Sequence, residues 1–404
     1  MTTATVAYPA LRHAPFRAYF VGAALAMMAD SVEHVISYWM IFQKFQSPAL
    51  AGFAIVSHWL PFLLFGVWSG SLADRFDPRR IIQIGMCCFM AASLGWGLLF
   101  VTDSLEMWHA AVLLVLHGCA GVLWNPAAQV LVHDIVDGGI LHSAIRLTAT
   151  ARWLGLLMGP AVGGVILLAL GPAWGILFNV LIYLPFIYVL TRIPYQRKGS
   201  SAARRVRGIA DIVGTVRQVA GDRVIVSMML LAGCASLIVG NAYHAQMPEF
   251  AADFGHADGG LTYSALFGAD AAGALAAGLL LEARGWLQAK PRSAFLLALG
   301  WCVAIGGFAL STSYPLALGL LFAAGFLELS FYAMAQTLVQ MRAPDATRGR
   351  VMGLFAMSAL GMRAFSGVTV GIGGSLIGIH WSLALSALAA LAVTLALLAF
   401  TIRK

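Results

Sequence analysis

Residues 70–80 read GSLADRFDPRR, and they lie where two long apolar segments, 48–73 and 79–101, meet. The stretch contains a glycine, two aspartates and three arginines, whereas the rest of both segments contains no lysine, arginine, aspartate or glutamate. About 20 apolar residues are enough for a helix to cross a bilayer. The stretch is therefore expected to be a short basic turn between two membrane-spanning helices.

The same pattern extends over the whole chain. Of its 404 residues, 60% are apolar and only 10% are charged, whereas soluble domains carry about 25% charged residues. Segments of spanning length occur at 16–43, 48–73, 79–101, 107–132, 142–169, 172–193, 223–248, 259–283, 291–311, 315–341, 350–377 and 380–400. We therefore predict an all-α membrane protein with twelve transmembrane helices.

The basic residues predict the orientation. The net charge is +8, and most of the 25 lysines and arginines fall in loops on one side of the predicted topology, with only Lys44 on the other. Basic loops face the cytoplasm, so we expect a multi-pass protein of the bacterial inner (plasma) membrane with both termini cytoplasmic. Because membrane topology accounts for the positive charge, we expect no nucleic-acid partner. The five cysteines all lie in apolar segments and form no CxxC pair.

The chain contains an internal repeat. A shift of 211 residues places Gln129 on Gln340 and Asp134 on Asp345, and it places Asp30 on Asn241. Two parallel six-helix halves with a substrate site between them form a known transporter plan. We predict an N-terminal six-helix bundle at 1–193, a basic cytoplasmic linker at 194–222 and a C-terminal six-helix bundle at 223–404. We expect a monomer.

The loop at 70–80 has a physical interpretation. Gly70 permits close helix packing, and Asp74 can face a helix N-terminus, where negative charge is favoured. Arg75, Arg79 and Arg80 can pair with acids across a cytoplasmic gate, although a plain positive-inside turn would also explain them. The pattern resembles the loop signature of the major facilitator superfamily, from which it departs at residues 77 and 78. The resemblance implies a two-bundle fold, and we include Asp345, Arg348 and Arg350 of the second half in the gate.

A glycine-rich motif in span five points to export. It consists of Gly155, Gly159, Pro160, Gly163 and Gly164, and it resembles the motif of exporters and antiporters in the superfamily. Glycines one turn apart also allow tight packing without any directional meaning, so that alternative stays open. Residues 124–134 and 344–353 are similar to the branch that contains the enterobactin exporter and macrolide-efflux proteins. The resemblance covers nearly the whole chain.

Ionisable residues at mid-depth are the candidate site, because charge inside a membrane is costly and usually functional. Asp30 and Glu328 are the first candidates for proton carriers. Arg152 and Arg363 are permanently charged and could bind an anionic substrate or pair with acids. The full predicted cavity set is Asp30, Glu33, His34, His58, His117, Arg152, Asn241, His244, Asp270, Glu328 and Arg363. The candidate walls for an organic substrate are Trp59, Trp124, Trp153, Phe331 and Tyr332; a lipid-facing or packing role would explain these aromatic residues equally well.

These observations predict a secondary active transporter that exports a small organic molecule, drug-like or siderophore-like, in exchange for protons by alternating access. Its expected partners are the substrate, protons and membrane lipid, and we expect no cofactor. The sequence shows no arrangement of nucleophile and base that would indicate an enzyme. One alternative is export of a divalent transition metal. Asp30 and His34 share a helix face, and their spacing resembles ferroportin, an iron exporter of the superfamily. A non-transporting receptor is a third possibility.

Overall fold

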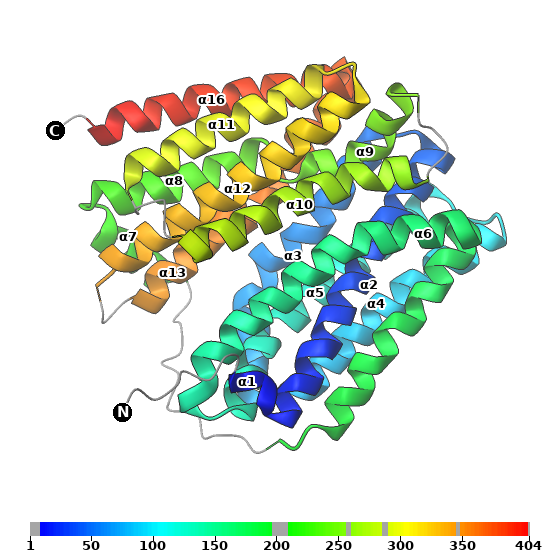
Figure 1. Ribbon diagram of the computed structural model, residues 1–404, viewed down its shortest axis with the longest axis horizontal. Coiled ribbons are helices and arrows are strands. Elements are labelled where there is room, and N and C mark those ends of the chain that lie inside the picture. Colours follow the sequence, from blue (N-terminus) through cyan, green and yellow to red (C-terminus); the bar gives the residue numbers. More distant parts are fainter. Residues whose placement is uncertain (1–8, 196–208, 256–259, 285–289, 345–347, 403–404) are drawn as a thin grey trace. The chain divides into compact units, whose positions relative to one another are not determined.

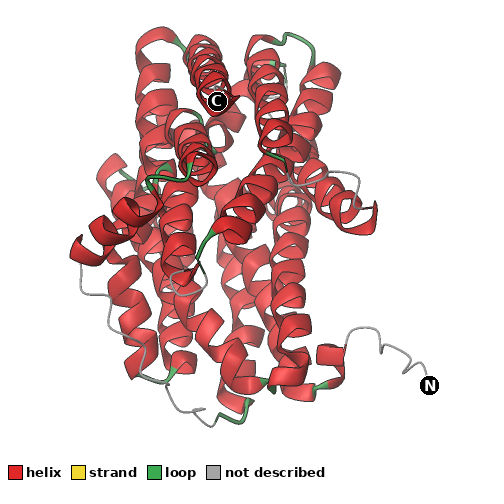
Figure 2. Ribbon diagram, turned by 90° about the vertical axis from the view of Figure 1, so that its left-hand side faces the viewer, coloured by secondary structure: helices red, strands yellow, loops and turns green. Residues whose placement is uncertain are grey.

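The computed structural model describes the chain except residues 1–8, 196–208, 256–259, 285–289, 345–347 and 403–404, and a few further side chains within helices. Every regular element among the described residues is a helix, and they include no strand (Figure 2). The all-α prediction is confirmed.

The chain divides into two compact units. Unit 1 contains residues 1–37 and 64–204, and unit 2 contains residues 38–63 and 205–404. The main division therefore falls inside the predicted linker, 194–222. Residues 38–63, which include the end of the first span and most of the second, group with unit 2.

Unit 1 is built from the first half of the chain. Its helices are α1 (Pro9–Arg12), most of α2 (Ala14–Phe45), the end of α3 (Pro48–Arg75), α4 (Pro78–Val101), α5 (Met107–Ile135) and α6 (Gly138–Arg192). Its core contains large aromatic side chains, among them Tyr19, Phe89, Tyr183 and Phe186. These side chains pack α2, α4 and α6 against one another.

Unit 2 holds the remaining helices, and α10, α11 and α12 lie side by side within it (Figure 1). The α-helices of unit 2 from residue 205 onward are α7 (Ile209–Val219), α8 (Arg223–Ile238), α9 (Ala242–Asp253), α10 (Leu261–Arg284), α11 (Pro291–Leu310), α12 (Tyr314–Arg342), α13 (Arg348–Ala356), α14 (Arg363–Ser366), α15 (Gly373–Ile377) and α16 (Ile379–Ile402). Two π-helical segments, η1 (Met357–Gly361) and η2 (Gly367–Ile372), interrupt the eleventh predicted span.

Ten segments of the described chain are long and apolar enough to cross a membrane. The prediction has twelve spans. One difference arises in α6, where spans five and six run together as one element of 55 residues. Gly171 breaks this element, with φ 72° and ψ 172°, and Pro172 follows it; a glycine adopts such a conformation without steric cost. The other is α10, which is helical over the eighth predicted span but is not among the ten.

Helix starts follow from local chemistry. Asp77 caps α4 by accepting the backbone N–H of Arg79 at 2.9 Å, and Pro78 is the first helical residue. Asp222 caps α8 by accepting the backbone N–H groups of Val224 and Ile225. Such caps satisfy donors that a helix leaves unpaired at its N-terminus. Residues 77 and 78, where the chain departs from the superfamily loop pattern, are thus the N-cap and the first residue of α4.

Candidate functional site

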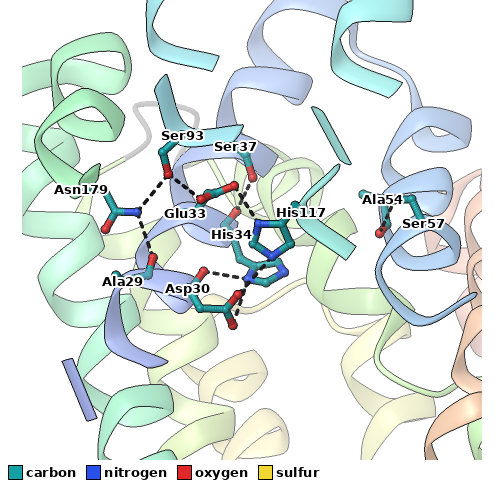
Figure 3. A network of polar contacts seen from close by, with 10 residues as sticks. All are labelled: Ala29, Asp30, Glu33, His34, Ser37, Ala54, Ser57, Ser93, His117 and Asn179. Atoms are coloured by element: carbon teal, nitrogen blue, oxygen red, sulfur yellow. Dashed lines mark hydrogen bonds and ion pairs between the residues drawn. The ribbon is translucent and has the colours of Figure 1, made fainter. Parts of the chain in front are cut away.

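Unit 1 contains a buried polar cluster at the middle of its helices. The side chains of Asp30 and Glu33 on α2 and of His117 on α5 lie together (Figure 3). All three are buried, and Glu33 is only 1% exposed. The three residues come from two helices that otherwise consist mostly of apolar residues. Burial of unpaired charge is costly, so the contacts among these side chains are essential to the unit.

His117 lies between the two carboxylates. Its Nδ1 is 2.7 Å from Oε1 of Glu33, and its Nε2 is 3.0 Å from Oδ1 of Asp30. A neutral imidazole carries one N–H and one acceptor lone pair. With both carboxylates ionised, one of these contacts would set two lone pairs against each other. The arrangement is therefore satisfied only when the cluster holds one more proton, either on the imidazole or on a carboxyl group.

Two further polar residues extend the cluster. Ser93 Oγ on α4 donates to Oε2 of Glu33 at 2.5 Å, and Asn179 on α6 donates to Ser93 Oγ at 3.4 Å and to the carbonyl of Ala29 at 3.0 Å. These bonds give the second oxygen of Glu33 a donor. Ser93 and Asn179 were not among the predicted cavity residues, although a polar side chain within an apolar span is a signal that a sequence can show.

His34 lies beside the cluster. Its Nδ1 donates to the backbone carbonyl of Asp30 at 2.8 Å, and its ring meets the ring of His117 edge to face with centroids 4.7 Å apart. The Asp30 carboxylate is 3.9 Å from the same nitrogen. The metal-export alternative, which uses Asp30 and His34, stays a prediction.

Unit 2 contains a second polar cluster. Asp270 on α10 accepts a hydrogen bond from Tyr243 Oη at 3.1 Å, and its other oxygen is 3.1 Å from Nε2 of His244. Tyr243 and His244 both lie in the first turn of α9. Asp270 thus has two partners of its own.

Arg363 and Glu328 form a charged pair within unit 2. Nη2 of Arg363 on α14 donates to Oε1 of Glu328 on α12 at 2.9 Å. The guanidinium carbon lies 5.3 Å from the ring centroid of Trp59 and 5.5 Å from that of Tyr332, within range of a cation–π interaction. Trp59 in turn donates its Nε1–H to Asn241 at 3.0 Å.

The other predicted cavity residues lie on their expected spans. Arg152 is on α6 and is partly buried. His58 is on α3, in unit 2, and its ring contacts those of Trp59 and Phe62.

The span-five motif packs α6 against α2 beside the first cluster. A Cβ atom on Gly155 would lie 2.6 Å from Cβ of Met27, and one on Gly159 would lie 2.2 Å from Cβ of Ser31. Gly163 is less crowded, since a Cβ there would lie 3.3 Å from Val35. The glycines therefore allow the close approach that positions the part of α2 carrying Asp30.

The loop at 70–80 is tied within unit 1. Arg79 forms an ion pair with Asp77 at 2.7 Å, and its Nη1 donates to the carbonyl of Ile193 at 2.8 Å. The guanidinium also lies over the ring of Tyr195. Arg79 thus links the start of α4 to the end of α6.

The remaining gate residues are only partly described. Arg75 and Arg80 are exposed on α3 and α4. The side chains of Gly70, Asp74, Arg348 and Arg350, and all of Asp345, lie outside what the structure describes. The predicted cytoplasmic gate therefore stays a prediction.

The Asp77 cap leads to a pH-dependent prediction. Burial favours the neutral acid, but hydrogen bonds and charge from Arg79 outweigh it and lower the pKa of Asp77. A lowered pKa stabilises the fold above the ordinary aspartate range, and this contribution is lost as pH falls through the folded-state pKa. At neutral pH, Asp77→Ala should reduce the free energy of unfolding by about 1 kcal/mol. Thermal unfolding in detergent should show this difference shrinking in acid; Asp77→Asn, which keeps a capping oxygen, should lose less.

The comparisons agree with this architecture. The family described as "Transmembrane secretion effector", one of the major facilitator (MFS) families, matches residues 5–404. The chain is 25% identical over 349 residues to the enterobactin exporter of Shigella boydii serotype 4, covering 85% of this chain and 81% of that one. It is 22% identical over 184 residues to the staphyloferrin A transporter of Staphylococcus aureus. That match covers 44% of this chain and slightly less than half, 46%, of the relative.

Solved structures share the fold. A bacterial homologue of the human lysosomal transporter Spinster matches with a TM-score of 0.70 at 15% identity, covering 98% of this chain and 96% of that one. A D-xylose–proton symporter matches with a TM-score of 0.68 at 16% identity, covering 97% and 98%. At these identities the likeness concerns the fold alone. The family match over residues 5–404 shows that the chain belongs to the transmembrane secretion effectors, a family of multi-pass MFS transporters.

Proposed function

We propose that this protein exports a small organic molecule, siderophore-like or drug-like, across the bacterial inner membrane in exchange for protons. Both termini would face the cytoplasm, as the basic loops predict. The two halves would expose a central site to each side in turn, as in other transporters of this plan. The names of the relatives, an enterobactin exporter and a staphyloferrin A transporter, support the substrate class.

The observation that carries proton coupling is His117 between Asp30 and Glu33. With both carboxylates ionised and the imidazole neutral, the three groups sum to two negative charges; the proton that the geometry requires reduces this sum to one. A change in charge at a buried site alters the free energy of that site by several kcal/mol. Proton binding can therefore favour one conformation of unit 1 over another.

Glu328 and Asp270 provide a second acidic location in unit 2. Glu328 lies on α12 and Asp270 on α10, and Arg363 pairs with Glu328. We assign the primary proton site to unit 1, because only there does one imidazole contact two carboxylates among the described residues.

Proteoliposomes containing a trapped pH-sensitive dye would test the proposal. Enterobactin, staphyloferrin A and ethidium would be added in turn, with protein-free liposomes as the control. At least one compound is expected to move protein-dependently and to drive proton movement in the opposite direction. Substrate movement at the same rate with and without a pH gradient, and with no proton signal, would contradict the antiport mechanism.

A further inference from the structure

Arg363 in unit 2 has hydrogen-bonding capacity that the protein does not use. Its Nη2 donates to Glu328, but its Nε is buried and has no hydrogen-bond partner among the residues that the structure describes. Nε and Nη2 form one edge of the guanidinium group, and this edge matches the two oxygens of a carboxylate. Glu328 accepts a hydrogen bond from only one of these two nitrogens, Nη2.

The acids near Arg363 do not supply the missing acceptor. Asp270 is held by Tyr243 and His244. Glu328 is the acid that contacts the guanidinium, and it does so through Oε1 alone. A buried, unpaired donor on a charged group costs more than one on a neutral group, so a ligand that supplies a second oxygen would gain this free energy.

Two aromatic rings beside the guanidinium are held in place. Trp59 donates to Asn241 at 3.0 Å. Tyr332 hydroxyl bonds with Ser236 and also donates to the carbonyl of Ala232 at 3.3 Å. These bonds fix the polar edges of both rings. Each ring presents a face to the guanidinium, and Phe331 stacks on Tyr332 with ring centroids 4.4 Å apart.

The backbone around Arg363 is also unusual. Arg363 opens a four-residue α-helical turn between the π-helical segments η1 and η2. The backbone N–H of Met362 bonds to the carbonyl of Met357, five residues earlier, at 3.3 Å. Single π-helical turns occur frequently at functional sites.

We propose that Arg363 binds a carboxylate of the exported molecule through its Nε–Nη2 edge, and that Trp59 and Tyr332 contact a flat, conjugated part of the same molecule. The substrate class is then an organic anion with an aromatic or conjugated group. The anion displaces Glu328 from Nη2. This inference rests on the proposed export function and narrows its substrate.

Equilibrium binding to the purified full chain in detergent tests the inference with a matched pair of probes. 2-Naphthoate and 2-naphthamide share a ring system, but only the former is an anion. Wild-type protein should bind 2-naphthoate at least about tenfold more tightly than 2-naphthamide, as expected for a hydrogen-bonded charge pair. Arg363→Gln should abolish this preference, and Arg363→Lys, which keeps the charge but not the fork, should reduce it.

Glu328→Gln removes the competing carboxylate, so it should tighten 2-naphthoate binding severalfold and leave 2-naphthamide unchanged. The control is Asp253→Asn, which alters an exposed aspartate that pairs with His380. It should change the binding of neither 2-naphthoate nor 2-naphthamide. The size-exclusion profile of each variant would establish that it is folded. Equal binding of the two probes, a preference that survives Arg363→Gln, or no saturable 2-naphthoate binding up to about 10 mM would overturn the inference.

The result is independent of proton coupling, because the measurement uses neither a gradient nor flux. Proton-coupled flux without a preference for 2-naphthoate would contradict only the Arg363 assignment. A preference for 2-naphthoate together with uncoupled flux would contradict only the antiport mechanism.

Discussion

Asp30→Asn is expected to reduce export driven by a pH gradient by at least about tenfold, which corresponds to about 1.4 kcal/mol. In the variant, His117 contacts one carboxylate, that of Glu33, and a neutral imidazole can donate to it without a further proton. The cluster then loses the proton that the wild-type geometry requires. Movement of substrate down its own gradient should be far less affected, because the change is isosteric.

The measurement is substrate efflux from proteoliposomes with and without an imposed pH gradient. Asp253→Asn is the matched control, since it makes the same chemical change in a histidine–aspartate pair that is half exposed, with Asp253 at 52%. It should keep the wild-type response. An Asp30→Asn protein that responds to the pH gradient like the wild type would rule out the assigned proton site.

Gly325→Ala is expected to give the largest loss of stability. A Cβ atom on Gly325 in α12 would lie 1.9 Å from the carbonyl oxygen of Asp270 in α10, and one on Gly273 in α10 would lie 1.9 Å from that of Phe322 in α12. The neighbour in both cases is backbone, so the helices must separate. Overpacking of this kind costs about 1–3 kcal/mol or more, and the apparent melting temperature should fall by roughly 2–10 °C.

The same two helices supply the controls. Gly268 in α10 and Gly319 in α12 have no atom within 4 Å of an added Cβ. Gly268→Ala and Gly319→Ala should leave the melting temperature unchanged or raise it slightly, because alanine favours helix over glycine. Equal effects of Gly325→Ala and Gly319→Ala on thermal unfolding in detergent would show that the close contact does not limit stability.

Gly325→Ala should also impair transport through Asp270. The carbonyl that meets Gly325 belongs to the residue whose carboxylate contacts Tyr243 and His244. A shift of α10 would move that carboxylate relative to α9. Flux measured per folded molecule should therefore fall in Gly325→Ala and not in Gly319→Ala.

Much of the fold follows from composition. Hydropathy and span length are properties of each segment alone, and they predicted helices where the structure has them. The break at Gly171 and Pro172 was also visible in the sequence as a short connection. The assignment of residues 38–63 to unit 2 was not, because it depends on which helices these residues contact in three dimensions.

The site was only partly predictable. Counting depth along each span placed Asp30, Glu33 and His117 at one level, and unit 1 brings these three together. The partner of each charge depends on helix rotation and crossing, so the pairing of Arg363 with Glu328, 35 residues away, had no signal in the spacing. Gly273 and Gly325 escaped notice for the same reason, among 43 glycines in the chain.

The two π-helical segments around Arg363 allow the eleventh span to change register without unfolding. A π turn holds one residue more than the α pattern. If η1 relaxed to α-helical bonding and η2 took up a second extra residue, the side chains between them would turn by about 100° around the helix axis. Such an exchange would rotate Arg363 together with the other three residues of α14, while the helical residues before η1 and after η2 kept their register.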